Sequence, residues 1–294
     1  MMEQSRNQIL YWLSVAFYTI VLLGVLLYLR FPGERFKEYC EYRIEKWLPG
    51  VSCTIAGIGY EFPVKIIFEQ MRLTGGENNS LLFEDPQFTL QPAWAHLSEA
   101  VNVKSRAFSG NHSALIGINH EQDRIELENL QIEGAEVKEI TLFQRKDKKI
   151  EGTLAGSGSA VINQQSLAVV AAEGDFTVAD LEFELNTPLF QLTAIDLAQS
   201  SFHLSLDQSV IELKDGKISN AKIDGVFQGA VILADPLWIS KLALTGNITP
   251  KVELFQGKEQ LQAVVSGVQR RYGSDEIPFK VGGSINSPTF IFGK

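Results

Sequence analysis

The chain is poor in cysteine and has no cluster of basic residues, and each shortage excludes a class of protein. Only two of its 294 residues are cysteines, so it is not a small disulfide-rich protein. Its 35 acidic residues outnumber its 26 basic ones, which gives a net charge of −9. Nucleic-acid binding needs clustered Lys and Arg against phosphates and is therefore not expected. The length allows one large or two modest domains.

Motifs for catalysis, metal binding and phosphate binding are missing as well. The four histidines lie in unrelated contexts, and no two of them are four residues apart. The sequence contains neither a Gly-x-Ser-x-Gly nucleophile motif nor a phosphate-binding loop. We therefore predict no enzyme activity, no catalytic, metal-binding or cofactor-binding residues, and no cofactor.

Residues 9–29 form the one long stretch without charge. About 20 apolar residues are enough to cross a hydrocarbon core of ~30 Å. Tyr11, Trp12 and Tyr28 lie near its ends, where aromatic rings favour the headgroup level. A cleaved signal peptide is the alternative, but its apolar region is shorter and ends at small residues, whereas this stretch is followed by Arg30. The pattern predicts a transmembrane helix over 9–29.

The basic residues beside this stretch leave its orientation open. Arg6 precedes it, whereas five basic residues follow it between positions 30 and 46. Taken alone, this count places the large domain in the cytoplasm. Long domains, however, cross the membrane largely regardless of their charge, so the opposite orientation is equally consistent with the rule.

Residues 30–49 are predicted to form a juxtamembrane amphipathic helix. Phe36, Cys40 and Ile44 recur every four residues and form one apolar stripe, and Pro49 and Gly50 end the helix. Two roles fit this stripe and are compatible. It could lie on the membrane surface, or it could cap the sheet that follows.

From residue 51 onward, the spacing of apolar residues changes from the helical period of 3.6 to a period of two. Apolar and polar residues alternate, as at 125–128, 181–186 and 202–207, which predicts strands with one apolar face. Other helical stretches, at 93–100, 188–198 and 236–242, are short. A parallel α/β fold needs longer helices between its strands. We therefore predict a mainly β domain over 50–294, built on a long curved antiparallel sheet.

The apolar face of such a sheet must be covered or must bind something. A sandwich, a barrel and an open groove all satisfy the alternation, and periodicity alone does not choose among them. The small number of helices favours a sheet that covers itself or curls. The candidate residues lining an apolar groove are Leu181, Phe183, Leu185, Phe202, Leu204, Leu206, Ile211 and Leu213.

Two local features leave alternatives open. Asp215-Gly216 predicts a two-residue hairpin turn that would place Leu213 opposite Ile218, although a bulge would also fit. Cys40 and Cys53 lie on either side of the Pro49-Gly50 reversal. They could form a disulfide in an oxidising compartment, but two separate buried thiols are the favoured interpretation.

Several segments resemble the type II secretion system protein N (GspN) family in its AsmA-related form. The similar segments span nearly the whole chain: FPGE at 31–34, PGV at 49–51, IAGI at 55–58, FPVKIIF at 62–68, LQP at 90–92, LWISKLALTGNITP at 237–250 and PFKVGGSINSP at 278–288. The resemblance implies a single-pass protein of a Gram-negative inner membrane, with residues 1–8 in the cytoplasm and 50–294 in the periplasm.

The resemblance also implies two functions. The first is a structural or assembly component of a type II secretion system, with other secretion-system proteins and the lipid bilayer as partners. The second is an AsmA-like envelope protein that binds or transfers phospholipid through an apolar β-groove. Both are non-enzymatic.

Overall fold

A computed structural model gives the fold of most of the chain. It describes residues 12, 14–19, 21–23, 25, 26, 32–47, 51–61, 65–75, 79–90, 100–119, 122–140, 150–164, 168–189, 192–234, 239–256, 259–285 and 287–292. Most of the predicted membrane span lies within this description, but residues 9–11, 13, 20, 24 and 27–29 lie outside it. Within the described part of the chain, none of the helices combines the length and hydropathy that a membrane span requires.

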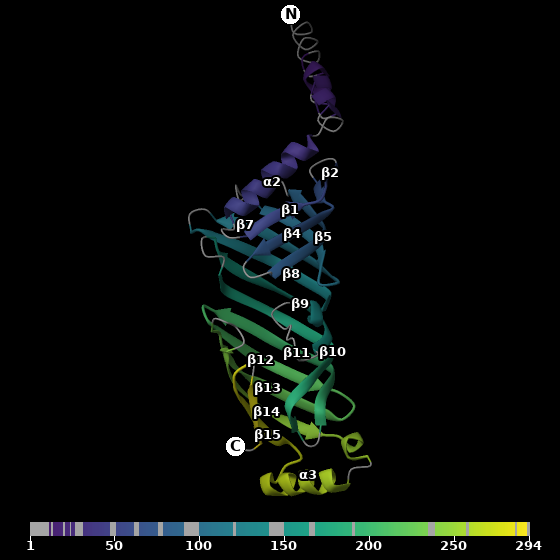
Figure 1. Ribbon diagram of the computed structural model, residues 1–294, viewed down its shortest axis with the longest axis vertical. Helices are drawn as coiled ribbons and strands as arrows, with labels where there is room; N and C mark the ends of the chain where they lie inside the picture. Colours follow the sequence, from purple (N-terminus) through teal and green to yellow (C-terminus); the bar gives the residue numbers. More distant parts are fainter. Residues whose placement is uncertain are drawn as a thin grey trace, which may run out of the picture.

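The described residues form one sheet with a helix at each end (Figure 1). The helices are α2 (Gly33–Trp47) and α3 (Glu259–Tyr272), and the short 3-10 helices are η1 (Val137–Glu139) and η4 (Val252–Phe255). The strands are β1 (Val51–Ile55), β2 (Ile58–Glu61), β3 (Lys65–Phe68), β4 (Gln70–Gly75), β5 (Asn79–Leu90), β6 (Ala100–Ala107), β7 (Gly110–Asn119), β8 (Arg124–Glu136), β9 (Ile150–Asn163), β10 (Val169–Leu189), β11 (Leu192–Asp207), β12 (Val210–Ser219), β13 (Ile223–Ile232), β14 (Lys241–Pro250), β15 (Ile277–Gly283) and β16 (Pro288–Phe292).

The 16 strands make one continuous antiparallel sheet that is not closed. From β4 to β16 each strand pairs with the next along the chain, and β1 pairs with β4 beyond the β2–β3 hairpin. The strand order therefore runs along the long axis of the molecule (Figure 1). This confirms the prediction of a mainly β, antiparallel fold. The helix expected at 188–198 is wrong, because β10 and β11 pair there at Leu189 and Leu192.

Bulges keep the apolar side chains on one face of the longest strands. Residues with positive φ lie in β8, β10 and β12: Asn129 at 50°, Asp180 at 49° and Asp215 at 51°. At each of these points the strand holds one residue more than at least one neighbour. Such an extra residue would otherwise shift every later side chain to the opposite face. A positive φ at Asn or Asp accommodates the extra residue with little strain, because these residues tolerate the left-handed region.

The hairpin predicted at Asp215-Gly216 is one of these bulges. Leu213 pairs with Leu204 of β11 and with Gly229 of β13, and Ile218 pairs with Ser200. The turn before β12 lies instead at Asp207–Val210, where the two strands meet. Asp-Gly favours positive φ in a bulge as well as in a turn, which is why the dipeptide misled the prediction.

Helix α2 covers one end of the sheet. Its stripe residues Cys40 and Ile44 pack on a buried cluster made by Cys53, Ile55, Phe68 and Met71. The described helix, Gly33–Trp47, lies within the predicted range of 30–49. The apolar stripe of α2 was expected to lie on the membrane surface or to cap the sheet, and the structure shows that it packs against the sheet.

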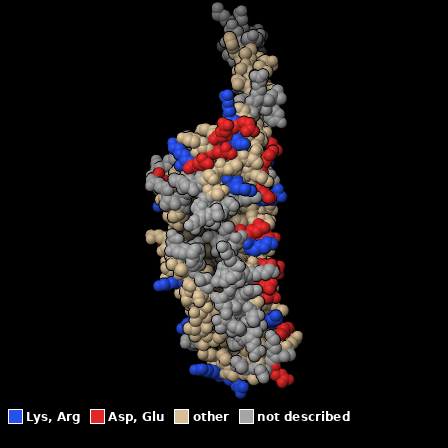
Figure 2. Space-filling view, viewed as in Figure 1, with Lys and Arg blue, Asp and Glu red and all other residues tan. Residues whose placement is uncertain are grey.

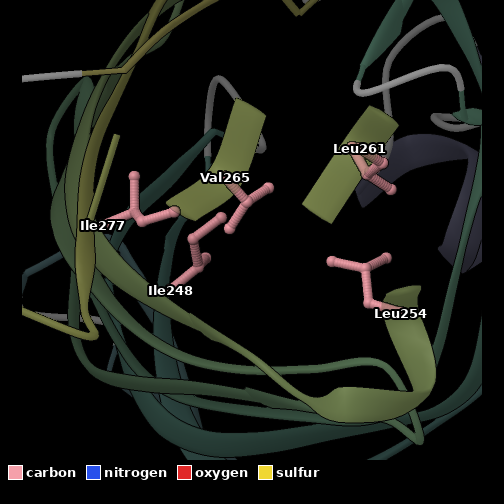
Figure 3. Packing of buried hydrophobic residues seen from close by; sticks show 5 residues of the cluster. All are labelled: Ile248, Leu254, Leu261, Val265 and Ile277. Carbon is pink, nitrogen blue, oxygen red and sulfur yellow. The ribbon is translucent and has the colours of Figure 1, made fainter. Parts of the chain in front are cut away.

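Helix α3 covers the other end and was not predicted. Leu261 and Val265 of α3 and Leu254 of η4 pack against Ile248 and Ile277 from the sheet. Figure 3 shows these five side chains pointing toward one another, with the ribbons of the sheet curving around them. The sheet is therefore curved here, and α3 lies inside the curve.

The bulge at Asp215 gives the first testable prediction. Asp215→Val should lower the free energy of unfolding by about 1–2 kcal/mol, because a β-branched residue is strained at positive φ. Asp215→Gly is the matched control and should change it little, since Gly adopts this conformation freely. Chemical denaturation followed by circular dichroism measures both. Equal stability of the two variants would show that the bulge does not need its positive φ.

Candidate functional site

One face of the sheet carries apolar side chains from strand to strand, and we call it the inner face. It is the face that α3 covers at one end. Cross-strand partners define it in the central strands, because directly opposed residues share a face. Ile132 lies opposite Gly156, Gly156 opposite Phe176, and Phe176 opposite Phe202.

Six of the eight predicted groove residues lie on this face. Leu204 pairs with Leu213, and Leu206 pairs with Ile211, across β11 and β12. The Phe202 ring stacks on Phe176 with 6.1 Å between ring centroids. Leu181 lies opposite Leu197. Phe183 and Leu185 belong to β10, but their side chains lie outside the described part of the structure.

The inner face is buried at its ends and mostly half-buried between them. The two clusters of buried hydrophobic residues lie under α2 and α3. In the central strands Ala135, Leu197 and Val231 are buried, but most of the larger inner-face side chains are of intermediate exposure, and no described helix covers them. This half-buried set includes Ile125, Leu127, Leu130, Ile132, Leu154, Phe176, Leu181, Phe202, Leu204, Leu206, Ile211, Leu213 and Phe227.

Phenylalanine rings lie over glycines along the inner face. A Cβ atom added at Gly216 would lie 2.7 Å from the ring of Phe227, its cross-strand partner. One added at Gly246 would lie 2.8 Å from the ring of Phe279, again its partner. Each ring therefore lies along the sheet, above the neighbouring strand. The rings cover backbone that glycine would otherwise expose and make a continuous apolar surface.

The opposite, outer face is polar in the same strands. His203 of β11 lies between two carboxylates of β10: its Nδ1 is 3.0 Å from Asp175 Oδ1, and its Nε2 is 3.5 Å from Glu173 Oε1. Both carboxylate side chains are well exposed, at 80% and 70%. The His203 side chain is half-buried and hydrogen-bonded. A histidine between exposed carboxylates of the neighbouring strand is typical of cross-strand pairing on a polar face.

A shallow depression of about 520 Å³ also lies over β5–β8. Its charged residues are of both signs, Lys104 and Arg106 against Glu133, so it favours neither anions nor cations. Among the described residues, no group of three or more His, Cys, Asp and Glu side chains could hold a metal ion. Figure 2 shows charged atoms gathered on α2 and along the borders of the view. The inner face is therefore the candidate functional surface.

Comparisons of the chain with protein-family models, with curated proteins and with solved structures each find no match.

Glycine substitutions test whether the rings lie on the sheet as described. Gly216→Ala should lower the free energy of unfolding by about 1–3 kcal/mol, because its methyl group would overlap the Phe227 ring and carbonyl oxygen. Gly267→Ala in α3 is the control, since nothing lies within 4 Å of an added Cβ there. Gly267→Ala should raise the free energy of unfolding by about 0.4–1 kcal/mol. Chemical denaturation measures both, and effects of the same sign would contradict the described packing.

Proposed function

We propose that this protein is a membrane-anchored, non-enzymatic lipid-binding protein whose inner face holds the acyl chains of a phospholipid. The observation that carries the proposal is the half-buried apolar face between the two helix-covered ends. Large exposed apolar patches are rare on soluble proteins unless a partner, a ligand or a membrane covers them. Leu, Ile and Phe dominate this surface, with few polar side chains such as His112 and Ser200, and such a surface suits saturated hydrocarbon better than a polar ligand.

The dimensions of the inner face fit an acyl chain. The central strands β6–β13 are eight consecutive neighbours in the sheet. Their seven spacings of about 4.8 Å give a path of about 34 Å. The hydrocarbon core of a bilayer is about 30 Å thick, so one leaflet's acyl chain spans about 15 Å. The face is therefore long enough to hold a whole acyl chain.

The uncharged stretch at 9–29 supports a membrane anchor. Its described residues are helical and leave large hydrophobic side chains exposed: Trp12 at 67%, Phe17 at 70% and Tyr18 at 67%. Apolar side chains exposed to this degree are suited to a hydrocarbon environment. We infer a single span, with residues 1–8 in the cytoplasm and the β domain in the periplasm, so that α2 lies between the membrane and the sheet.

A role in a type II secretion system stays a prediction that rests on the resemblance of the sequence segments. One feature of the sheet is compatible with it. β16 is the last strand in the order of the described sheet, and a partner's strand can pair with a strand at the edge of a sheet. The lipid-binding proposal is favoured here because it accounts for the inner face as a whole.

Lipid content tests the main proposal. The full-length protein, purified in a mild detergent, should carry phospholipid that native mass spectrometry detects. Leu204→Glu should remove this lipid, because a carboxylate on the inner face is costly to desolvate beside an acyl chain. Gln228→Glu is the control: Gln228 is exposed on the outer face of β13, and the new carboxylate stays in water.

Two results would contradict the lipid-binding proposal. The first is wild-type protein free of phospholipid. The second is an equal lipid load on folded Leu204→Glu and Gln228→Glu proteins. Circular dichroism checks that both variants retain their β structure. If Leu204→Glu is unfolded, Leu213→Glu takes its place, because Leu213 lies directly opposite on the same face.

The anchor and its orientation have a separate test. Protease added to intact spheroplasts should digest the β domain, and alkaline extraction should leave the protein in the membrane fraction. Disruption of the spheroplasts is the control, since it exposes both sides of the membrane. Protection of the β domain in intact spheroplasts would show that the basic residues at 30–46 lie in the cytoplasm.

A further inference from the structure

The fold brings the chain's two cysteines into one apolar cluster. Cys40 lies on the sheet-facing stripe of α2, and Cys53 lies in β1. Cys53 is 5% exposed within the buried cluster at this end, and half-buried Cys40 packs against the same cluster. Both thiols are free in the structure.

Two carboxylates of α2 fix the helix along β1. Glu45 Oε1 accepts a hydrogen bond from the backbone N–H of Cys53 at 3.1 Å, and Glu41 Oε1 accepts one from Ile55 at 2.7 Å. These contacts bind N–H groups of β1, which is the first strand in the order of the described sheet and pairs with β4. The helix therefore lies along the strand in a fixed register, with Glu45 beside Cys53 and with Glu41, the neighbour of Cys40, beside Ile55.

We propose that Cys40 and Cys53 form an intramolecular disulfide that covalently ties α2 to the edge of the sheet when the protein meets a disulfide oxidant. The reaction is two thiol–disulfide exchanges. The Cys40 thiolate attacks the external disulfide, and one thiol of the oxidant leaves. The Cys53 thiolate then attacks the Cys40 sulfur, and the second thiol leaves. The two cysteines are oxidised to one disulfide, and the oxidant is reduced to two thiols.

Burial and charge set the order and the rate of these steps. Cys40 is the more exposed thiol and reacts first. Burial, together with the charges of Glu41 and Glu45, raises the pKa of Cys53 to about 11. Its thiolate fraction therefore increases about tenfold for each pH unit between pH 7 and 9, and ring closure should accelerate in parallel.

Oxidation of the full-length protein in detergent tests the proposal. The protein is reduced, freed of reductant and treated with glutathione disulfide at pH 7, 8 and 9. Free thiols are then labelled in denaturant with a maleimide and counted by mass spectrometry. We expect both thiols to disappear without a remaining glutathione adduct, at a rate that increases about tenfold per pH unit. A tryptic digest should yield one peptide pair joined through Cys40 and Cys53.

A shifted cysteine is the matched control. In the double variant Cys53→Ser/Ser52→Cys, the second thiol moves by one residue, to a position whose side chain is exposed on β1. The sequence separation from Cys40 is almost unchanged, but the thiol points to the other face of the strand. This variant should retain glutathione on its cysteines and close at least tenfold more slowly than wild type.

Three results would overturn the disulfide. They are wild-type protein that keeps both thiols, wild-type protein that keeps stable glutathione adducts on both cysteines, and bonds that join two molecules instead of one. Equal closure rates for wild type and the shifted variant would also overturn it, because they would show that chain proximity rather than the folded register brings the thiols together.

Discussion

A sheet of a single layer has an apolar face that no second sheet covers, and the rest of this structure follows from that constraint. Nearly every strand pairs with its neighbours along the chain, so the sheet grows in one direction and stays one layer thick. Burial of apolar surface is the main force that stabilises a fold. Here it is concentrated at two places, under α2 and under α3, where helices supply the missing layer. Between them, no helix in the described part of the chain covers the face.

The long sheet also requires its strands to keep one face apolar over many residues. Strict alternation of apolar and polar residues keeps one face apolar only where the strand has no bulge or bend. The bulges at Asn129, Asp180 and Asp215 bend the strands and still return the next apolar residue to the inner face. The paired glycines and phenylalanines also help to keep the inner face apolar. A ring lying over a glycine adds apolar surface without filling the space above the sheet.

Much of this fold could be predicted from sequence, because the signals were local. Alternation predicted the strands, and the residues proposed for the groove lie on β10, β11 and β12, with Leu204 opposite Leu213 as a shared face requires. Asp215-Gly216 was misplaced because the same residues favour a turn and a bulge, and only the partner strands distinguish them. Helix α3 was missed although Leu261, Val265 and Val268 have helical spacing, since its valines and Gly267 have low helix propensity. The placement of Cys40 against the cluster that contains Cys53 depends on how α2 docks, which no local pattern encodes.

The central proposal is that the inner face, and not the outer one, binds phospholipid in the cell. Site-specific photo-cross-linking tests it most directly. A benzoylphenylalanine is placed at Leu204 or Leu213 on the inner face and, in separate variants, at Ser205 or Glu212, which oppose each other on the outer face. Cells are grown with radiolabelled phosphate and irradiated. The account predicts labelled phospholipid attached to the protein at the two inner positions and absent at the two outer ones. Equal labelling at all four positions, or labelling at none, would contradict it.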